Sequence, residues 1–581
     1  MTQRWLKSRS ALVVACLLWL VIAFAGLPFA WHAAVTRWLA YGPSARPYWA
    51  IAVAALVVAL AIVSRWLSAI TQLRCRPFTI ALAGAAWCAV HAACWQWQAS
   101  SLADDPTVVV LYVATTGWIA WCGAMWFSQY AVASRATLLA ISFVPVAVWT
   151  ISVHSGGLDG QGRPIVNWRF ASEAQAAAWP TAVSDTLPLQ KVAEVQNDYP
   201  AFRGRRGLGA VEGVKLATDW ASTPPRQIWR RAVGSGWGGF AVVHGSAFTQ
   251  EQRGADECVV CYEAATGRER WVHSDRACFT STTAGDGPRA TPSVFDRHVY
   301  SLGASGLLNC FDALSGNCHW LVDTLADNQA SNLYHGLSGS PLVIGELVVV
   351  SVGGREHSMV AYNRRTGRRV WHAGTDPAGY GSPLACTLDG IEQIVILNRP
   401  GLASHNPATG EVLWTFPWTN DQETNCSQPV PVGNDRLLVS TGYGKGCALI
   451  RVQQSAGGWL VETLWTSRQL RTKFASAVVR DGFAYGLDDG ILSCIDLADG
   501  SRRWRAGRYG HGQVLLVGDS LLVECESGDV ALVATDPTAH RELGRIAALA
   551  EKTWNYPVLA GSLLLVRNDR EAACFDVVIS D

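Results

Sequence analysis

The sequence predicts a membrane-embedded bundle of about five helices, followed by an all-β domain that forms an eight-bladed β-propeller of four-stranded antiparallel blades. Two observations predict this fold class. Apolar residues are concentrated in the first 154 residues, in stretches long enough to span a bilayer. After residue 220, a short phrase ending in tryptophan recurs every 39 to 51 residues, an interval typical of propeller blades.

The composition of the 581 residues limits the partners that we expect. Hydrophobic residues make up 50% and charged residues 16% of the chain, and this charged fraction is low for a soluble protein. The 47 basic and 46 acidic residues nearly balance, with no basic tail or stripe. We therefore expect membrane lipid, and no nucleic acid, among the partners.

Five apolar stretches predict transmembrane helices, because each is close to the ~20 residues that cross the hydrocarbon core. They cover residues 11–31, 49–70, 77–97, 107–130 and 136–154. Basic residues favour the N-terminus and the second and fourth loops over the first and third loops. The positive-inside rule therefore predicts a cytoplasmic N-terminus and an extracytoplasmic chain after His154. We expect a multi-pass protein of the bacterial inner membrane with a periplasmic C-terminal domain.

Residues 155–219 are predicted to form an extracytoplasmic linker between the helices and the propeller. The linker begins with the turn-rich stretch SGGLDGQGRP. The residues that follow have no sustained hydrophobic period, and a short helix at 171–179 is compatible with them. We therefore expect the linker to contribute no blade of its own.

The repeated phrase has the form small–x–acid or amide–x–x–Thr/Ser/Asp–Gly–x–x–x–Trp. Five copies read CYEAATGRERW, CFDALSGNCHW, AYNRRTGRRVW, SHNPATGEVLW and CIDLADGSRRW, and two decayed copies end at Trp465 and Leu543. Turn signals such as Asp489-Gly490 separate short strands and indicate four antiparallel strands per unit. We expect the glycine to permit the turn before the last strand. The tryptophan should supply a flat surface that packs between blades.

The two ends of the repeated region complement each other. The last unit contains Cys574 and Asp576 but lacks the glycine and the tryptophan, and an isolated upstream strand, RQIWRRAV, carries Trp229. We expect this strand to complete the last blade, because an open ring would leave an unpaired sheet edge. The propeller then covers 220–581 with eight blades. Its docking tryptophans are Trp229, Trp271, Trp320, Trp371, Trp414, Trp465 and Trp504.

The cysteines are expected to be structural. The small first position of the phrase is a cysteine in four units: Cys261, Cys310, Cys494 and Cys574. Small residues are needed where sheets approach, so we interpret these four as buried hydrophobic side chains rather than disulfides. No cysteine pair has the spacing of a zinc site, and Cys258 and Cys261 lie three apart in a strand, where they face opposite ways. We predict no metal site from the cysteines.

The phrase resembles the tryptophan-docking motif of pyrroloquinoline-quinone (PQQ) dehydrogenases and their relatives, over residues 220–577. Five helices before a propeller also resemble membrane-bound quinoprotein glucose dehydrogenase. The resemblance implies a propeller of PQQ-like repeats. That fold serves quinoprotein dehydrogenases and also a non-enzymatic lipoprotein of the outer-membrane β-barrel assembly machinery. Here the blades are minimal, the vicinal Cys-Cys pair of the alcohol enzymes is absent, and no calcium-binding set aligns, so only docking positions carry over.

A ligand site is predicted at one mouth of the central channel, where the opening residues of each blade's first strand should meet. These residues are Trp237, Arg289, Tyr380, Gln428, Phe474, His511, Trp554 and Asn555, with Glu251 nearby as an oxygen ligand or base. Aromatic rings beside arginine, histidine and amides suit a flat anionic ligand such as a quinone. The alternative is that these side chains only fill the channel mouth.

Two functions are compatible with these features, and no catalytic residue is identified. The one we favour is a membrane-anchored binding or scaffold module at the cell envelope, with envelope proteins as partners. The alternative is a PQQ-dependent alcohol or sugar dehydrogenase that uses PQQ with Ca²⁺ and donates electrons to membrane quinone. The minimal blades favour the first, whereas the helices and the aromatic mouth favour the second.

Overall fold

The computed structural model describes residues 153–160, 164–168, 198–281 and 284–577. The five predicted membrane spans, apart from Val153 and His154, and the helix predicted at 171–179 lie outside these ranges. Val153 and His154 begin a strand instead of ending a helix. Within the described ranges, no helix is both long and apolar enough to cross a membrane.

The chain divides into two compact units, which are described separately. The first unit contains a hairpin of strands β1 (Val153–Leu158) and β2 (Pro164–Trp168), which pair antiparallel. The start of the predicted linker thus contains two paired strands. Its turn-forming residues hid two short pairing segments, because glycine and proline weaken the alternating pattern that identifies strands.

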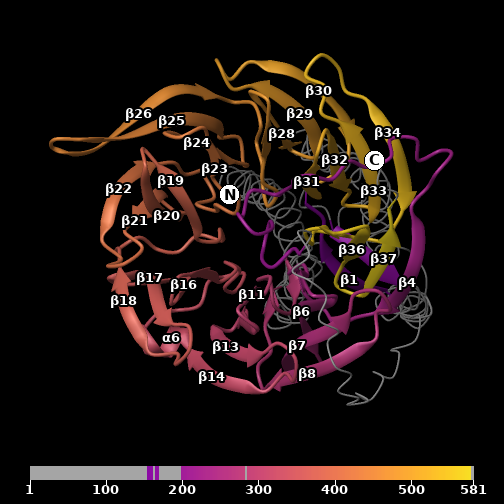
Figure 1. The fold of residues 1–581 in the computed structure, drawn as a ribbon, viewed down its shortest axis with the longest axis horizontal. Coiled ribbons are helices and arrows are strands. Elements are labelled where there is room, and N and C mark those ends of the chain that lie inside the picture. The colour runs from indigo at the N-terminus through magenta and orange to yellow at the C-terminus, as the bar shows by residue number, and fades with distance from the viewer. Residues whose placement is uncertain (1–152, 161–163, 169–197, 282–283, 578–581) are drawn as a thin grey trace, which may run out of the picture. The chain divides into compact units, whose positions relative to one another are not determined.

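The second unit is a ring of eight antiparallel sheets (Figure 1), which confirms the predicted eight-bladed propeller. Blades 1 to 4 consist of β5 (Ala241–Val243), β6 (Ser246–Arg253), β7 (Asp256–Glu263) and β8 (Glu269–Asp275); β11 (Ser293–Phe295), β12 (His298–Leu302), β13 (Leu307–Asp312) and β14 (Cys318–Asp323); β15 (Leu342–Ile344), β16 (Leu347–Gly354), β17 (His357–Asn363) and β18 (Arg369–Ala373); and β19 (Leu384–Leu388), β20 (Ile391–Leu397), β21 (Gly401–His405) and β22 (Val412–Pro417).

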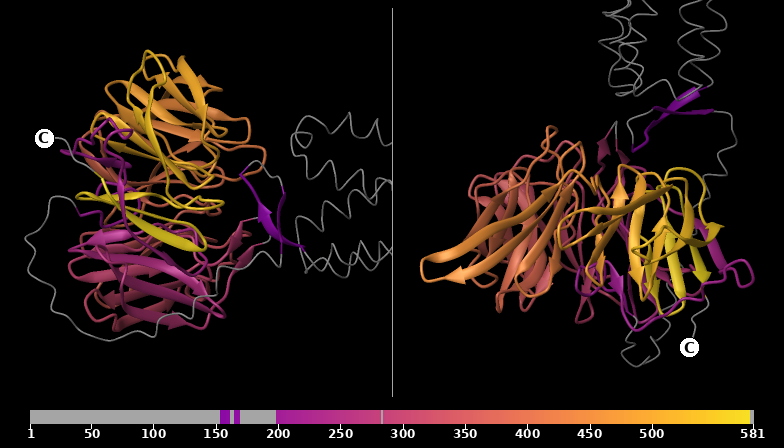
Figure 2. Two further views of the ribbon diagram at one scale, coloured as in Figure 1. Left: turned by 90° about the vertical axis from the view of Figure 1, so that its right-hand side faces the viewer. Right: turned by 90° about the horizontal axis from the view of Figure 1, so that it is seen from above.

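Blades 5 to 8 repeat the same four-stranded plan, and in side view each sheet runs between the two faces of the ring (Figure 2). They consist of β23 (Val430–Val432), β24 (Arg436–Thr441), β25 (Gly446–Ser455) and β26 (Gly458–Ser467); β27 (Val478–Arg480), β28 (Phe483–Asp488), β29 (Ile491–Asp496) and β30 (Arg502–Arg508); β31 (Gln513–Val517), β32 (Ser520–Glu524), β33 (Asp529–Ala534) and β34 (Glu542–Ala547); and β35 (Val558–Ala560), β36 (Leu563–Arg567), β37 (Glu571–Asp576) and β4 (Arg226–Ala232). Short additions are α6 (Thr324–Asp327) and the β9 (Thr280–Ser281) and β10 (Gly285–Asp286) pair.

The ring is closed by the strand that contains Trp229, as predicted. Strand β4 pairs antiparallel with β37, and Trp229 lies opposite Cys574. Figure 1 shows the magenta strand β4 beside the yellow strand β37 at the edge of the ring. Pairing with β4 gives blade 8 its fourth antiparallel strand.

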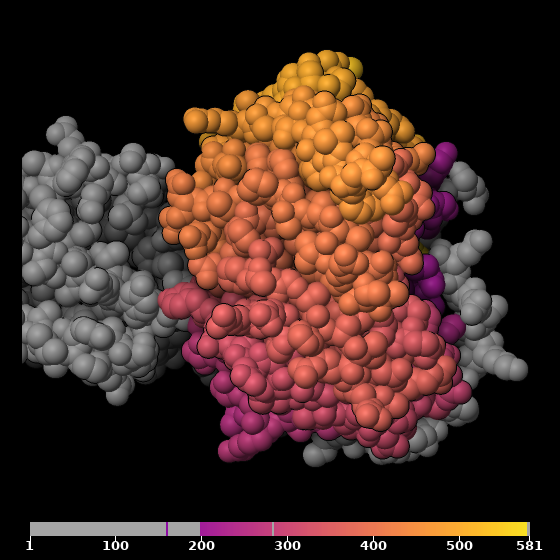
Figure 3. Space-filling view, turned by 90° about the vertical axis from the view of Figure 1, so that its left-hand side faces the viewer, coloured from indigo at the N-terminus to yellow at the C-terminus, as the bar shows by residue number. Residues whose placement is uncertain are grey.

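Most docking tryptophans connect each blade to the next through the indole N–H. The indole Nε1 donates to a backbone carbonyl oxygen of the following blade in six pairs: Trp229–Ala264 (2.8 Å), Trp271–Ala313 (3.1 Å), Trp320–Arg364 (3.0 Å), Trp371–Pro407 (3.1 Å), Trp465–Leu497 (3.0 Å) and Trp504–Asp536 (2.7 Å). Figure 3 shows that the pink to orange blades form a continuous outer surface. The docking interaction therefore combines a hydrogen bond with burial of the ring.

The glycine of the phrase has a second role beyond its turn. Gly267 has φ +70°, and a Cβ there would lie 2.7 Å from the Trp229 ring. Gly316, Gly367, Gly410 and Gly500 lie in the same way against the tryptophan of the blade before them. A larger residue at this position would therefore displace the neighbouring indole as well as strain the turn.

Trp414 departs from this pattern. Its indole donates to the side-chain oxygen of Gln393 at 2.7 Å, within its own blade. Blade 5, which follows it, has the decayed copy of the phrase and forms an extended hairpin from β25 and β26, each of 10 residues. Gly457 and Gly458 lie at the β25–β26 turn, but an added Cβ on either would have no atom within 4 Å, so neither glycine packs on Trp414.

The four cysteines at the small position are fully buried and carry free thiols, as predicted. Cys261, Cys310 and Cys494 each lie opposite the docking tryptophan of their own blade, as Cys574 lies opposite Trp229. Burial raises the pKa of each of these thiols to about 12. They therefore remain protonated and act as small hydrophobic groups at the contact.

Residues 198–219, which the sequence analysis also assigned to the linker, are packed on the propeller. Tyr199 is buried and bridges Val242, and Arg203, 1% exposed, donates to the carbonyl of Ala477 at 2.8 Å. Strand β3 (Ala210–Val211) adds in parallel to β31. The segment escaped prediction because its only strand has two residues and its glycines adopt positive φ.

Candidate ligand site at the channel mouth

The segments that lead into the first strands are tied together around the ring. Backbone N–H groups donate to a side-chain hydroxyl of the following blade, as from Thr291 to Ser340 and from Ser340 to Ser382, both at 2.9 Å. Gly239 donates likewise to Thr291, and Gln428 to Ser476. This set of contacts was missed in the sequence, although the recurring Ser-Pro and Thr-Pro pairs mark several of the positions.

Four of the predicted mouth residues form an aromatic cluster. The ring centroids of Trp237 and Trp554 are 5.0 Å apart, with an interplanar angle of 40°. Phe474 lies 4.9 Å from Trp554 and 5.6 Å from His511. The cluster joins residues from blades 1, 6, 7 and 8, so the fold brings together side chains that are distant in sequence.

Polar contacts hold this aromatic cluster in place. The carboxylate of Glu526 accepts from the Trp554 indole and from the backbone N–H of His511, both at 2.9 Å. The side chain of Gln513 donates to the carbonyls of Phe474 (3.1 Å) and Trp554 (2.8 Å). Buried Asn555 donates to the carbonyls on both sides of Trp237, at Gly236 and Gly238. The rings are therefore oriented by backbone and carboxylate contacts rather than by stacking alone.

A lysine that the sequence analysis did not select lies over the two indoles. The Nζ atom of Lys552 is 4.9 Å from the centroid of Trp237 and 4.5 Å from that of Trp554. Both distances are within the range of cation–π attraction. The position of Lys552, two residues before Trp554, does not reveal this contact in the sequence. Which aromatic rings the flexible lysine side chain can reach depends on the fold.

A second cluster surrounds Arg289. Its guanidinium donates to the carbonyl of Gly285 at 2.7 Å and lies 4.8 Å from the centroid of Phe279. His335, from the segment before blade 3, lies 5.5 Å from Tyr380. Burial lowers the pKa of Arg289, and the carboxylates of Glu257 and Asp286 oppose that shift. Gly285 connects the two clusters, because the Trp237 ring packs against it.

His335 is expected to make the propeller sensitive to acid. Burial, and then the charge of Arg289, lower the pKa of His335 to about 4. The unfolded chain binds this proton near pH 6.5, so stability should fall as the pH drops from about 6.5 to about 4. We expect His335→Phe to remove roughly 1–2 kcal/mol of this loss of stability, since the ring is half-buried and partly screened by solvent. Denaturant unfolding of the wild type and of His335→Phe across this pH range measures the difference in stability.

The control for this prediction is the same substitution at exposed His319, which should leave the acid dependence unchanged. Equal acid dependence in the wild type and the His335→Phe protein would contradict the assignment.

The other two predicted mouth residues have structural partners. Gln428 is buried and, with its amide oriented to satisfy both ends, donates to the carbonyl of Ser382 at 2.9 Å. Glu251 is fully buried and accepts from the Tyr262 hydroxyl at 2.6 Å and from the Arg253 guanidinium at 3.0 Å. The nine predicted residues are thus divided among the two clusters and these separate buried contacts, and Glu251 belongs to neither cluster.

The described residues do not fit PQQ with Ca²⁺ at this mouth. The oxygens of Glu251, the suggested metal ligand, already accept hydrogen bonds from Tyr262, Arg253 and the backbone of Gly234. The two indoles are tilted and in contact with each other, so they do not form a parallel slot for a flat quinone. In the described part of the chain, no three His, Cys, Asp or Glu side chains are grouped to hold a metal.

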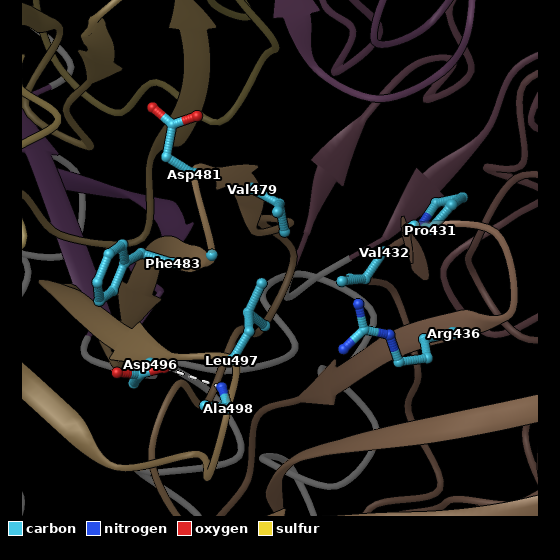
Figure 4. A pocket seen from close by; sticks show the side chains of 11 residues that line it. Pro431, Val432, Arg436, Val479, Asp481, Phe483, Asp496, Leu497 and Ala498 are labelled. Atoms are coloured by element: carbon cyan, nitrogen blue, oxygen red, sulfur yellow. Dashed lines mark hydrogen bonds between the residues drawn. The ribbon is translucent and has the colours of Figure 1, made fainter.

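A separate pocket of about 500 Å³ lies between blades 5 and 6, at the end of the strands opposite the mouth (Figure 4). Arg436 lies on one side of this pocket, and Asp481 and Asp496 lie on the other, with Leu497 between them. Asp481 pairs with Arg480, and Asp496 accepts from the backbone of its own turn. None of the predicted site residues lines this pocket.

Comparison with known proteins agrees with the geometry. A family model described as "Outer membrane protein assembly factor BamB", of the PQQ repeat type, matches residues 255–506. The domain is a PQQ-repeat β-propeller. The match covers the phrases that end at Trp271, Trp320, Trp371, Trp414 and Trp504, whose docking contacts are described above.

Two curated relatives of the PQQ-repeat propeller are named as dehydrogenases. Quinohemoprotein alcohol dehydrogenase ADH-IIG of Pseudomonas putida is 31% identical over 148 residues, or 23% of this chain and 19% of that protein. The dehydrogenase subunit of the alcohol dehydrogenase (quinone) of Acetobacter aceti is 23% identical over 301 residues, or 46% of this chain and 38% of that protein. The matches thus span about a fifth and two fifths of these relatives' lengths.

Solved structures similar to the PQQ-repeat propeller include both kinds of protein. BamB from Moraxella catarrhalis has a TM-score of 0.45 and 16% identity, covering 61% of this chain and 99% of that chain. Quinohemoprotein alcohol dehydrogenase ADHIIG from Pseudomonas putida HK5 has a TM-score of 0.49 and 12% identity, covering 67% of this chain and 81% of that chain.

Proposed function

We propose that this protein is a membrane-anchored binding or scaffold module whose PQQ-repeat propeller works outside the cytoplasm, at the cell envelope. The observation that carries the proposal is the composition of the channel mouth. Its rings, amides and charges are held by the protein's own contacts, with Glu526 and Lys552 around the two indoles. Such a mouth presents a preformed recognition surface and lacks a built cofactor site.

The anchor and the orientation rest on the sequence. The apolar stretches between residues 11 and 154 supply the membrane attachment, and the distribution of basic residues places the propeller on the periplasmic side. Membrane lipid is then the first partner of the helices. An envelope protein is the partner of the propeller, an assignment supported by the description of the matching family model.

Capture of a partner by the full-length protein tests this function. We expect cross-linking in the native membrane to recover an envelope protein, and the double variant Trp237→Ala, Trp554→Ala to lose most of it, because it removes the aromatic surface of the mouth. The matched control is Val370→Ala, since Val370 is 52% exposed on the outer strand β18. Equal capture by both variants would exclude the mouth as the binding surface.

The second candidate is a quinoprotein dehydrogenase, which the 31% identity to an alcohol dehydrogenase over 148 residues favours. PQQ would supply the redox chemistry and membrane quinone would accept the electrons. The full-length protein in detergent is incubated with PQQ and Ca²⁺, and dye reduction is measured with alcohols and sugars. Activity that disappears in the double variant His511→Ala, Arg289→Ala would replace the scaffold function. Failure to bind PQQ would exclude the dehydrogenase.

A further inference from the structure

The Lys552 ammonium is bound by the protein as a ligand would be bound. It lies over two indole faces, at 4.9 Å and 4.5 Å from their centroids. Two tilted aromatic faces around one cation are the geometry by which proteins recognise organic ammonium groups. We refer to Trp237, Trp554, Phe474 and His511 as the aromatic cage.

The aromatic cage is positioned independently of Lys552. Trp554 is held by Glu526 through its indole nitrogen, and the backbone around Trp237 is held by Asn555. Gly285 supports the other side of Trp237, where an added Cβ would lie 3.0 Å from the ring. The two indoles should therefore keep their relative orientation when the lysine side chain moves away.

The charges at the rim of the aromatic cage favour a cation. Glu526 places a carboxylate at the indole edge of Trp554. Asp569 interacts electrostatically with Lys552 and Arg570, which oppose the rise in its pKa that burial causes. On the opposite side, the guanidinium of Arg289 is engaged by the carbonyls of Gly285 and Gly287. Asp569 thus interacts with the lysine, Glu526 binds one of the two indoles, and the arginine is directed to backbone oxygens.

We propose that the aromatic cage binds an organic ammonium group, of the quaternary or methylated class, and that Lys552 occupies the cage as a tethered competitor until such a ligand arrives. The inference rests on the proposed binding function and names the ligand class of the same site. A primary ammonium is strongly hydrated, whereas a methylated one loses less hydration on entering an aromatic site. The free energy of exchanging the lysine for an external methylated ammonium is therefore favourable.

The test is to remove the competitor from the full-length protein. Tetramethylammonium chloride is titrated into the wild type and into Lys552→Gln in detergent, with sodium chloride at matched ionic strength as the blank. Binding is followed by calorimetry and by tryptophan fluorescence. We expect Lys552→Gln to bind tetramethylammonium about fivefold or more tightly than the wild type, because the binding-competent state is then always populated.

The chain offers a matched control. Lys445 lies 4.5 Å from the centroid of Trp418, outside the aromatic cage, so Lys445→Gln removes the same charge and the same type of contact. This variant should bind with wild-type affinity. Adding Trp554→Leu to Lys552→Gln should abolish the binding.

Two results would overturn the proposal. One is the absence of saturable binding of tetramethylammonium by Lys552→Gln. The other is tighter binding of PQQ, an anion, by the wild type than by Lys552→Gln, which would make Lys552 a ligand contact. Either result leaves the scaffold function to be decided by the cross-linking experiment, so the two failures are distinguishable.

Discussion

Replacement of Trp229 by alanine is expected to destabilise the propeller by about 3–5 kcal/mol, the range measured for large-to-small changes at packed aromatic residues. The indole packs on Gly267 and donates to the carbonyl of Ala264 at 2.8 Å. Trp229 also belongs to β4, the strand that pairs with β37 to complete blade 8 and close the ring. The loss should appear as a lower denaturant midpoint for the full-length protein.

A double-mutant cycle with Gly267 isolates the docking contact. Gly267→Ala alone should be strongly destabilising, because the new Cβ would lie 2.7 Å from the Trp229 ring and the backbone has φ +70°. In the Trp229→Ala background the clash is absent and only the strain at positive φ remains, about 1 kcal/mol. Additive effects of the two substitutions would contradict direct packing of the glycine on the indole.

The substitution Glu524→Gln is expected to stabilise the propeller at pH 7, seen as a higher denaturant midpoint than that of the wild type. Glu524 is fully buried, and neither carboxyl oxygen has a hydrogen-bond partner among the described residues. Burial raises the pKa of Glu524 well above its ordinary value. The folded protein therefore holds this proton to a higher pH than the unfolded chain, which releases it above about pH 4.3. Stability is therefore lost as the pH rises, and glutamine cannot ionise.

The pH dependence of this effect distinguishes it from a packing change. Well below the ordinary glutamate pKa both states of the wild type carry the proton, so the wild type and Glu524→Gln should differ least there. Between pH 4.5 and 7 the difference should grow. Glu411→Gln, at an exposed position in blade 4, is the control and should show no such trend. A constant difference at all pH values would show that packing causes it.

The regular part of the fold was predictable, because each blade repeats the same local chemistry. The pairing of Trp229 with Cys574 could be predicted for two reasons. The upstream strand carries a tryptophan but belongs to no repeat unit, and the last repeat unit lacks its fourth strand. For Gly267, the turn was predicted and the packing against the tryptophan was not. Its turn can be read locally, but its contact with Trp229 depends on the neighbouring blade.

The mouth was predicted less well than the blades. Its residues lie in irregular segments, where no period shows which side chains meet. Trp237 and Trp554 were selected and do touch, but the contribution of Lys552 and Glu526 was missed. Glu251 was selected as a nearby oxygen ligand or base, but alternation along β6 cannot reveal that Arg253 and Tyr262 engage its carboxylate. Long-range charge pairing of this kind becomes visible only in three dimensions.

The closure of the ring by β4 has a consequence for biosynthesis. Arg226 in β4 and its partner Asp576 in β37 are separated by 350 positions along the chain. Strand β4 is synthesised before the four strands of blade 1 but pairs only with β37, so its hydrogen-bonding edge stays open until the last blade is made. Protection of that edge would therefore matter most before the hairpin of β36 and β37 has folded.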